Sequence, residues 1–265
     1  MKFALVNGQR EEARPALSGD CPGCGCLMVA RCGEIRVRHW AHQGNRLCDP
    51  WWENETEWHR AWKNQFPADW QEFVQRAETG ERHIADVKTS RGWVIEFQHS
   101  YLKPEERRSR DLFYPKLIWV VDGTRRKRDI EQFGHAWQDG IPVGGNPNLR
   151  KTFSDSCLLL REWADSPSPI FFDLGQAQVL WWVLARGVNG SAYLAPYSRA
   201  KFIESHCSGG AEIAAREFDE FVSEIPKLVA KTTSHGPPRN VSKAFNNTRS
   251  SRTGLADAFS PRPER

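Results

Sequence analysis

The stretch of sequence that decides the fold is HIADVKTSRGWVIEFQ, residues 83–98. Apolar and polar residues alternate on both sides of a short central segment, which is typical of two β-strands whose side chains alternate between faces. The central segment, Ser90-Arg91-Gly92, fits a three-residue hairpin loop that ends in a left-handed residue, where glycine is favoured. We therefore expect a β-hairpin in which Thr89 pairs with Trp93.

The length of this loop decides which residues of the two strands face each other. With three loop residues, Asp86 falls opposite Glu96, and the β-carbons of such a pair lie roughly 4.5–5.5 Å apart. Two facing carboxylates repel each other unless a positive group lies between them, and a hard divalent cation such as Mg²⁺ or Mn²⁺ suits that place. Gln98 shares the face of Glu96. The alternative is an ordinary surface hairpin in which Lys88 compensates the acids.

The elements expected around the hairpin alternate in kind. A helix is predicted for residues 51–66, because Trp and Phe residues recur there at helical spacing between two prolines. Three strands, a helix and a strand are then expected at residues 72–76, 82–88, 93–98, 104–113 and 117–121. A strand, a crossover helix and another strand favour a right-handed α/β core.

Five of the seven cysteines lie between residues 21 and 48, and such clustering favours a metal over disulfides. Cys21 and Cys24 form a CPGC knuckle, and His39 and His42 supply a second pair of ligands. A hairpin that turns near residues 33–34 would bring the two pairs together. Two Cys and two His suit tetrahedral Zn²⁺.

This zinc assignment is not unique. Cys26 or Cys48 could replace a histidine, and reduced cysteines without a metal are the other alternative. Four protein ligands leave no open coordination position, so we expect the zinc to stabilise the fold rather than to do chemistry. Several arginines surround the site and suit contacts to phosphates: Arg31, Arg36, Arg38 and Arg46.

The net charge of +4 is unevenly distributed along the chain. Residues 231–265 carry seven Lys or Arg and two acids, so this tail has a charge of +5 and the rest of the chain −1. The tail is rich in Ser, Asn, Pro and Gly, which predicts a disordered segment; a non-specific phosphate-binding arm is the alternative. No run approaches 18 apolar residues and the N-terminus turns charged early, so we expect a cytoplasmic protein without a membrane partner.

Several motifs, taken in order, resemble the competence protein CoiA-like nucleases, a family within the PD-(D/E)XK superfamily. ADV and IEFQHS in the hairpin are followed by a charged helix and the apolar strand LIWVVDG. ETEWH at residues 55–59, with Lys63, resembles the first helix of the family. CPGC and HWAH resemble its N-terminal segments. The resemblance covers roughly residues 20–122.

This resemblance implies an α/β fold with a restriction-endonuclease-like core of helix, three strands, helix and strand. It assigns Asp86 and Glu96 to a Mg²⁺ or Mn²⁺ ion and Glu55 to the site as a further acid, with His59 on the same helix. Gln98 stands where the superfamily more often has Lys. Glutamine can orient a water molecule but cannot deprotonate it, so Lys88 or Lys63 would have to substitute electrostatically.

We therefore expect four parts in the chain: a zinc-ribbon-like segment, a nuclease core, an accessory α+β region and the basic tail, at residues 1–50, 51–135, 150–230 and 231–265. The expected function is metal-dependent hydrolysis of phosphodiester bonds in DNA, in the handling of incoming or recombining DNA. The alternative is a catalytically weak nucleic-acid-binding adaptor that retains the nuclease fold. The sequence identifies no protein partner.

Overall fold

The computed structural model of the chain describes most residues up to His206 and a few beyond. The described residues are 1–44, 51, 55–78, 80–143, 146–163, 165–186, 190–207, 216, 218–220 and 222–223. They belong to two compact units, Met1–Leu117 and Ile118–Arg265. The predicted basic tail at 231–265 and the candidate ligand Cys48 lie outside the described residues.

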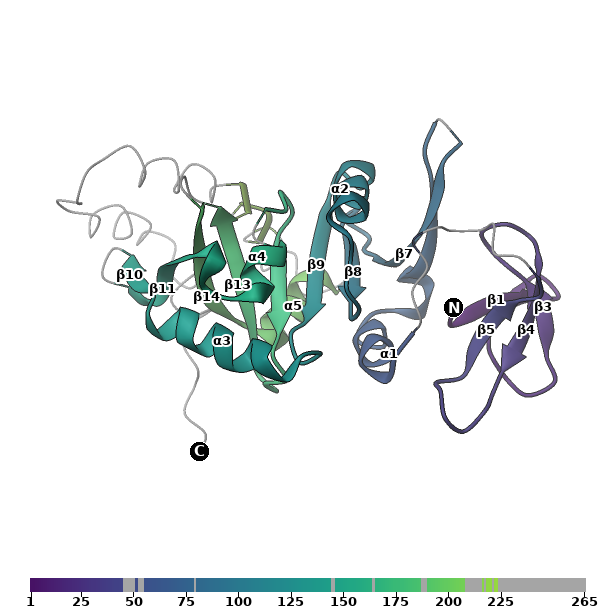
Figure 1. The fold of residues 1–265 in the computed structure, drawn as a ribbon. Coiled ribbons are helices and arrows are strands. Elements are labelled where there is room, and N and C mark those ends of the chain that lie inside the picture. Colours follow the sequence, from purple (N-terminus) through teal and green to yellow (C-terminus); the bar gives the residue numbers. More distant parts are fainter. Residues whose placement is uncertain are drawn as a thin grey trace. The chain divides into compact units, whose positions relative to one another are not determined.

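The first unit begins with a five-stranded antiparallel sheet (Figure 1). Its strands are β1 (Phe3–Val6), β2 (Gln9–Glu12), β3 (Ser18–Asp20), β4 (Leu27–Arg31) and β5 (His39–His42), in the order β2-β1-β3-β4-β5. Its core is small: Met1, Ala4, Ala13, Cys21, Met28 and Trp40. The hairpin predicted near residues 33–34 is present, with β4 and β5 paired from Met28–His42 to Arg31–His39.

The first helix, α1 (Glu57–Lys63), is shorter than predicted. Thr56 caps it, because its hydroxyl accepts a hydrogen bond from the His59 N–H at 3.2 Å. Trp51 and Glu55 therefore lie before the helix. The ring of Trp62 stacks on Phe97 at 5.6 Å, which fixes the apolar side of α1 against the hairpin.

The predicted hairpin is confirmed. Strands β6 (Gln71–Arg76), β7 (Arg82–Lys88) and β8 (Val94–Gln98) are antiparallel, with β7 between the other two. Thr89 N–H donates to the Trp93 carbonyl at 2.8 Å, and Lys88 pairs with Val94. Gly92 has a φ of 79°, the left-handed conformation that the three-residue loop requires.

Helix α2 (Pro104–Phe113) begins with proline, as predicted, and strand β9 (Leu117–Asp122) follows. A short 3₁₀ turn (Ala68–Trp70) precedes β6. The elements from α1 to β9 thus follow one another as helix, three strands, helix and strand. The division between the two units falls inside β9, whereas the sequence predicts a core that extends to about residue 135.

The second unit holds a mixed sheet, so the chain is an α/β protein. Its strands, in addition to β9, are β10 (Ile141–Val143), β11 (Asn146–Phe153), β12 (Ile170–Asp173), β13 (Val179–Arg186) and β14 (Ser191–Ser198). Their order is β10-β11-β14-β13-β12-β9, with β12 parallel to β9 and the other pairs antiparallel.

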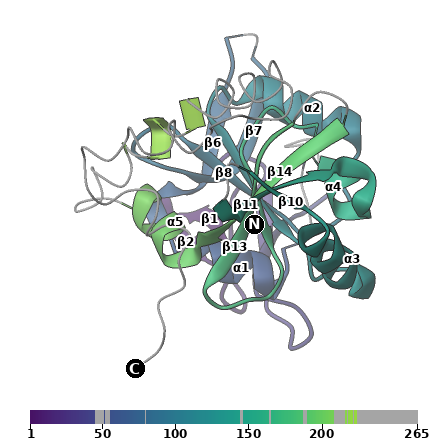
Figure 2. The same ribbon diagram turned by 90° about the vertical axis from the view of Figure 1, so that its left-hand side faces the viewer.

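Helices cover both faces of this second sheet (Figure 2). Phe133 of α3 (Lys127–Gln138) packs on Phe172, whereas Phe202 of α5 (Arg199–His206) packs on the neighbouring residue Phe171. Because adjacent strand residues point to opposite faces, α3 and α5 lie on opposite sides. Helix α4 (Leu158–Trp163) lies beside α3, after a 3₁₀ turn (Ser154–Ser156).

Candidate functional site

A cavity of about 60 Å³ in the first unit is lined by an unusual number of ionisable side chains. Four carboxylates, one imidazole, one amine and one guanidinium border it: Glu55, Glu72, Asp86, Glu96, His59, Lys63 and Arg110. They come from α1, the residues before it, strands β6 to β8, and α2. Buried ionisable groups are costly unless each is paired, so the contacts of each side chain decide what this site can do.

Asp86 and Glu96 are joined across the hairpin, as the predicted register requires. The N–H of Asp86 donates to Glu96 Oε1 at 3.4 Å, and the N–H of Phe97 donates to Asp86 Oδ2 at 3.0 Å. The backbone pair Val87–Ile95 precedes them. Past that pair, the carboxylates of Asp86 and Glu96 accept hydrogen bonds from N–H groups of the opposite strand. Both carboxylates are thereby held in fixed positions at the cavity.

The Asp86 carboxylate has a partner in His59, whose Nε2 lies 2.8 Å from Oδ2. Burial by itself would raise the pKa of Asp86. The His59 imidazole, the Lys63 ammonium and the Phe97 N–H outweigh burial and lower the pKa, so Asp86 is ionised at neutral pH. The other ring nitrogen, His59 Nδ1, is buried and makes no hydrogen bond within the described residues.

Glu96 has a different partner, the Arg110 guanidinium, at 3.3 Å. Arg110 also contacts Glu106 at 2.6 Å, and both carboxylates raise its pKa against the opposing effect of burial. Arg110 is buried, 5% exposed, and holds Glu96 in place.

Lys63 links the other two carboxylates of the cavity. Its Nζ lies 2.8 Å from Glu55 and 2.8 Å from Glu72. Burial would lower the pKa of Lys63, but Glu72 and Glu55 outweigh burial and raise it, so the amine stays protonated. For Glu55 the effect of burial is the opposite and would raise the pKa. The positive charges of Lys63 and Arg60 outweigh burial and lower the pKa of Glu55. Of the two lysines considered from sequence, Lys63 is the one that lines the cavity.

Glu72 was not recognised from sequence as a site residue. It has a φ of 49°, a left-handed conformation that costs a non-glycine residue roughly 1–3 kcal/mol. Its carboxylate accepts hydrogen bonds from the N–H groups of Lys2 and Phe3, at 2.5 and 2.9 Å. The pKa of Glu72 is lowered, because the Lys63 ammonium and the amino group of Met1 outweigh the effect of burial. No local pattern could reveal this residue, since Lys2 and Phe3, whose N–H groups hold its carboxylate, lie about 70 positions away.

The remaining predicted residues lie differently. The amide of Gln98 donates to the Ser100 carbonyl at 3.2 Å, and Gln98 is not among the residues that line the cavity. Lys88 contacts Gln75 at 3.0 Å and lies over the Phe73 ring. Neither side chain is among those that line the cavity beside Asp86.

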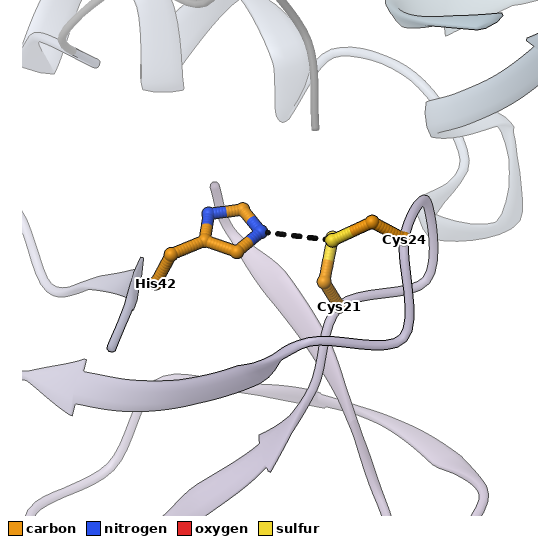
Figure 3. Close-up of side chains that lie close together, drawn as sticks. All are labelled: Cys21, Cys24 and His42. Carbon is orange, nitrogen blue, oxygen red and sulfur yellow. Dashed lines mark hydrogen bonds between the residues drawn. The ribbon is translucent and has the colours of Figure 1, made fainter. Parts of the chain in front are cut away.

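A second cluster lies in the N-terminal sheet, where Cys21, Cys24 and His42 point toward one another (Figure 3). Their ligand atoms all lie within 4.8 Å of one another, and Cys24 Sγ is 3.3 Å from His42 Nε2. The N–H of Gly23 donates a hydrogen bond to Cys21 Sγ at 3.4 Å. A hydrogen bond of this kind orients a metal ligand, here the sulfur of a cysteine thiolate. This cluster can hold a metal ion such as zinc.

The structure does not bring His39 to this cluster. Its Nδ1 lies 2.9 Å from the Val37 carbonyl oxygen. His39 and His42 lie three positions apart on one strand, so their side chains point to opposite faces. Such spacing brings two ligands together on a helix but separates them on a strand. Of the alternative ligands, Cys26 is exposed and outside the cluster, and Cys48 lies outside the described residues.

Among the described residues, no other group of three or more His, Cys, Asp or Glu side chains comes close enough to hold a metal. Asp86, Glu96 and Glu55 thus do not form a three-carboxylate site. Asp86 and Glu96 alone still match a donor set that Mg²⁺ accepts, in which one or two carboxylates are completed by water and substrate phosphate.

No protein-family model, curated protein or solved structure matches the chain. Within the described residues, no helix is both long enough and apolar enough to cross a membrane.

Proposed function

We propose that the chain is a Mg²⁺- or Mn²⁺-dependent nuclease that hydrolyses phosphodiester bonds in DNA, with a structural zinc ion in its N-terminal sheet. The observation that carries the proposal is the pair Asp86–Glu96, joined across a hairpin at a cavity. The motifs that resemble the CoiA-like nucleases, and the order of elements from α1 to β9, support a restriction-endonuclease-like core.

The buried charges favour a functional site over a structural ion-pair cluster. Replacing a buried ion pair by apolar residues of similar volume is often neutral or stabilising, so stability alone gives little reason to keep seven ionisable groups around one cavity. Perturbed pKa values beside a cavity are a feature of active sites. Glu72 adds backbone strain at the same place, which is also frequent at functional sites.

Each side chain then has a role in the proposed reaction. Asp86 and Glu96 would hold the metal ion, which supplies an activated water and polarises the phosphate. Arg110 and His59 keep the two carboxylates in place. Lys63 is protonated, so it stabilises negative charge on the phosphate and does not act as a base. The zinc ion would take no part in the reaction and would stabilise the fold.

The second candidate function is a nucleic-acid-binding adaptor with little or no activity. One observation favours it: each hairpin carboxylate already has a basic side chain as its partner, His59 or Arg110. Those partners would have to share the carboxylates with a metal ion. Gln98 in place of the usual Lys points the same way.

The test is cleavage of plasmid and single-stranded DNA by purified protein, with and without Mg²⁺ or Mn²⁺. Asp86→Asn should reduce cleavage more than about 100-fold, because loss of an outer partner of a metal ligand alone costs 10–100-fold. Asp69→Asn is the matched control, since Asp69 is an exposed acid on the 3₁₀ turn before β6. Thermal melts would verify that both variants fold.

Two results would contradict the nuclease. Wild-type protein that binds DNA but never cleaves it would identify the adaptor. Equal cleavage by wild type and Asp86→Asn would place the active site elsewhere.

A further inference from the structure

A second cavity, of about 630 Å³, lies on the surface of the first unit. Its lining includes four arginines and two glutamates: Arg10, Arg14, Arg38, Arg60, Glu11 and Glu12. This volume is within the range of cavities that hold ligands, roughly 300–1,000 Å³. The excess of arginine over glutamate makes it suited to an anion. We call the four arginines and the cavity they border the arginine groove.

Neighbouring groups hold two arginines of the groove in place and offset their positive charge only in part. Arg10 donates to the carbonyl oxygens of Ala68 and Gln71, at 3.0 and 2.7 Å, and lies over the Phe3 ring. Carbonyl oxygens and an aromatic ring fix a guanidinium but leave its positive charge in place. Arg14 contacts Glu11, which offsets part of the charge.

The groove connects to the candidate active site through Arg60. This residue donates to the Arg38 carbonyl at 3.0 Å and contacts Glu55 at 2.7 Å. Glu55 in turn lines the cavity of Asp86 and Glu96. A polymer with a repeating negative charge that lies in the groove would therefore pass close to the proposed metal site.

The loop between β4 and β5, residues 32–38, adds a second contact surface beside the groove. Ile35 in this loop is 98% exposed, and Arg31, Arg36 and Arg38 are exposed around it. None of the ion pairs found in the described part of the chain involves these three arginines. A large apolar side chain surrounded by unpaired guanidinium groups fits a ligand that presents both phosphates and an apolar surface.

We propose that the arginine groove and the β4–β5 loop bind the backbone of duplex DNA, with Ile35 against the sugars and bases of one of its grooves. Strand β5 is the edge strand of its sheet and pairs with β4, and the major groove of B-DNA is wide enough to admit two paired β-strands. This inference deepens the proposed nuclease function, on which the choice of DNA rests.

The experiment measures binding of a labelled duplex of about 20 base pairs by fluorescence anisotropy. Mg²⁺ and Mn²⁺ are left out, so cleavage cannot interfere, and no chelator is added, because it would remove zinc from the same sheet; wild type and variants are treated identically. The variant Arg36→Gln/Arg38→Gln removes two charges but keeps the Arg38 carbonyl that anchors Arg60. Each phosphate contact contributes about 0.9 to the slope of log affinity against log salt. We expect the slope to fall by about two and the affinity at low salt to fall roughly tenfold.

Arg161→Gln is the matched control, because Arg161 is an exposed arginine on α4 in the second unit. It should change neither the slope nor the affinity by a comparable amount. Ile35→Ser should lower the affinity without changing the salt slope, because it removes an apolar contact and no charge. Together, the two kinds of variant separate phosphate contacts from contacts to the sugars and bases.

The inference is overturned if the double variant has the slope and affinity of wild type. Tighter binding of single-stranded DNA than of duplex would overturn the choice of duplex. Wild-type cleavage combined with an unchanged salt slope in the double variant would reject the groove and leave the nuclease standing. The reverse result, groove-dependent binding without cleavage, would support the groove and reject the nuclease.

Discussion

Lys63 is the residue on which the buried charges of the candidate site depend. It contacts two carboxylates at once, and only 2% of its surface is exposed. Its cationic charge lowers the pKa of Glu55 and of Glu72 and contributes to the lowered pKa of Asp86. Removing it would leave Glu72 without its side-chain partner, whereas Glu55 would keep Arg60.

Lys63→Met should therefore destabilise the protein by about 3 kcal/mol at pH 7, the scale measured when one partner of a buried ion pair is removed. Glu55 and Glu72 have lowered pKa values, so they stabilise the fold above their ordinary pKa near 4.3, and this contribution is lost as the pH falls further. The variant lacks part of that contribution. Its free energy of unfolding should fall less steeply than that of wild type from about pH 5 downward.

Urea denaturation at a series of pH values measures this difference. Lys151→Met is the control, because Lys151 is exposed on β11 and should leave the pH profile unchanged. Parallel profiles for wild type and Lys63→Met would show that Lys63 is not the source of the acid sensitivity.

Among the single residues of the site, some can be predicted from sequence and others cannot. His59 and Lys63 lie four positions apart on one helix, so their common face follows from helical geometry. Asp86 and Glu96 follow from the length of one loop. Glu72 and Arg110 do not, because Lys2 reaches Glu72, and Glu96 reaches Arg110, only through the packing of separate segments.

Among the elements, the β7–β8 hairpin is the part most directly determined by local sequence. Its loop needs one residue in the left-handed conformation, and Gly92 occupies that position with a φ of 79°. Nothing lies within 4 Å of a β-carbon placed there, so only the backbone conformation limits the choice of residue.

Gly92→Ala should cost about 1–2 kcal/mol of stability, the cost of a left-handed conformation for a residue with a β-carbon. Because this loop sets the register of Asp86 and Glu96, the variant should also reduce cleavage if it shifts the hairpin. Chemical denaturation and the cleavage assay measure the two effects.

Gly33→Ala is the matched control for stability. Gly33 also lies in a hairpin loop with open space around it, but its φ is not in the left-handed range. Equal stabilities of the two variants would show that the β7–β8 loop can relax to another turn.

Other elements could not be predicted from their local sequence. Strand β2 has the sequence QREE and is mostly exposed, so it lacks the apolar residues that indicate a strand. The aromatic spacing at residues 51–66 predicted a helix longer than α1, because Trp51 follows the helical pattern without being part of the helix. In that segment the Thr56 cap decides where the helix begins.

At the scale of the whole molecule, the chain divides inside β9, which the sequence does not indicate. The apolar run Leu117–Val121 predicts a buried strand but not its neighbour. Its parallel partner β12 lies about fifty residues further along the chain, with α3, β10, β11 and α4 between them. Such long-range pairing has no local signal, so the sequence predicts a boundary near residue 135 rather than inside β9.

The division into two units leads to the final prediction, which concerns zinc. We expect about one tightly held zinc ion per chain by elemental analysis, bound by Cys21, Cys24 and His42. Because metal binding contributes folding free energy, chelation or Cys24→Ser should destabilise the N-terminal sheet. Hydrogen exchange should then be faster in β3, β4 and β5, the strands that flank or carry these ligands.

The effect should extend to β6 but not to the second unit. The N–H groups of Lys2 and Phe3 donate to Glu72, so loosening of β1 would release the carboxylate that holds Lys63. Strands β12 to β14 serve as the internal reference, and Cys207→Ser is the matched variant outside the cluster. Unchanged exchange throughout the first unit after complete metal removal would show that the cysteines pack there without a structural role for zinc.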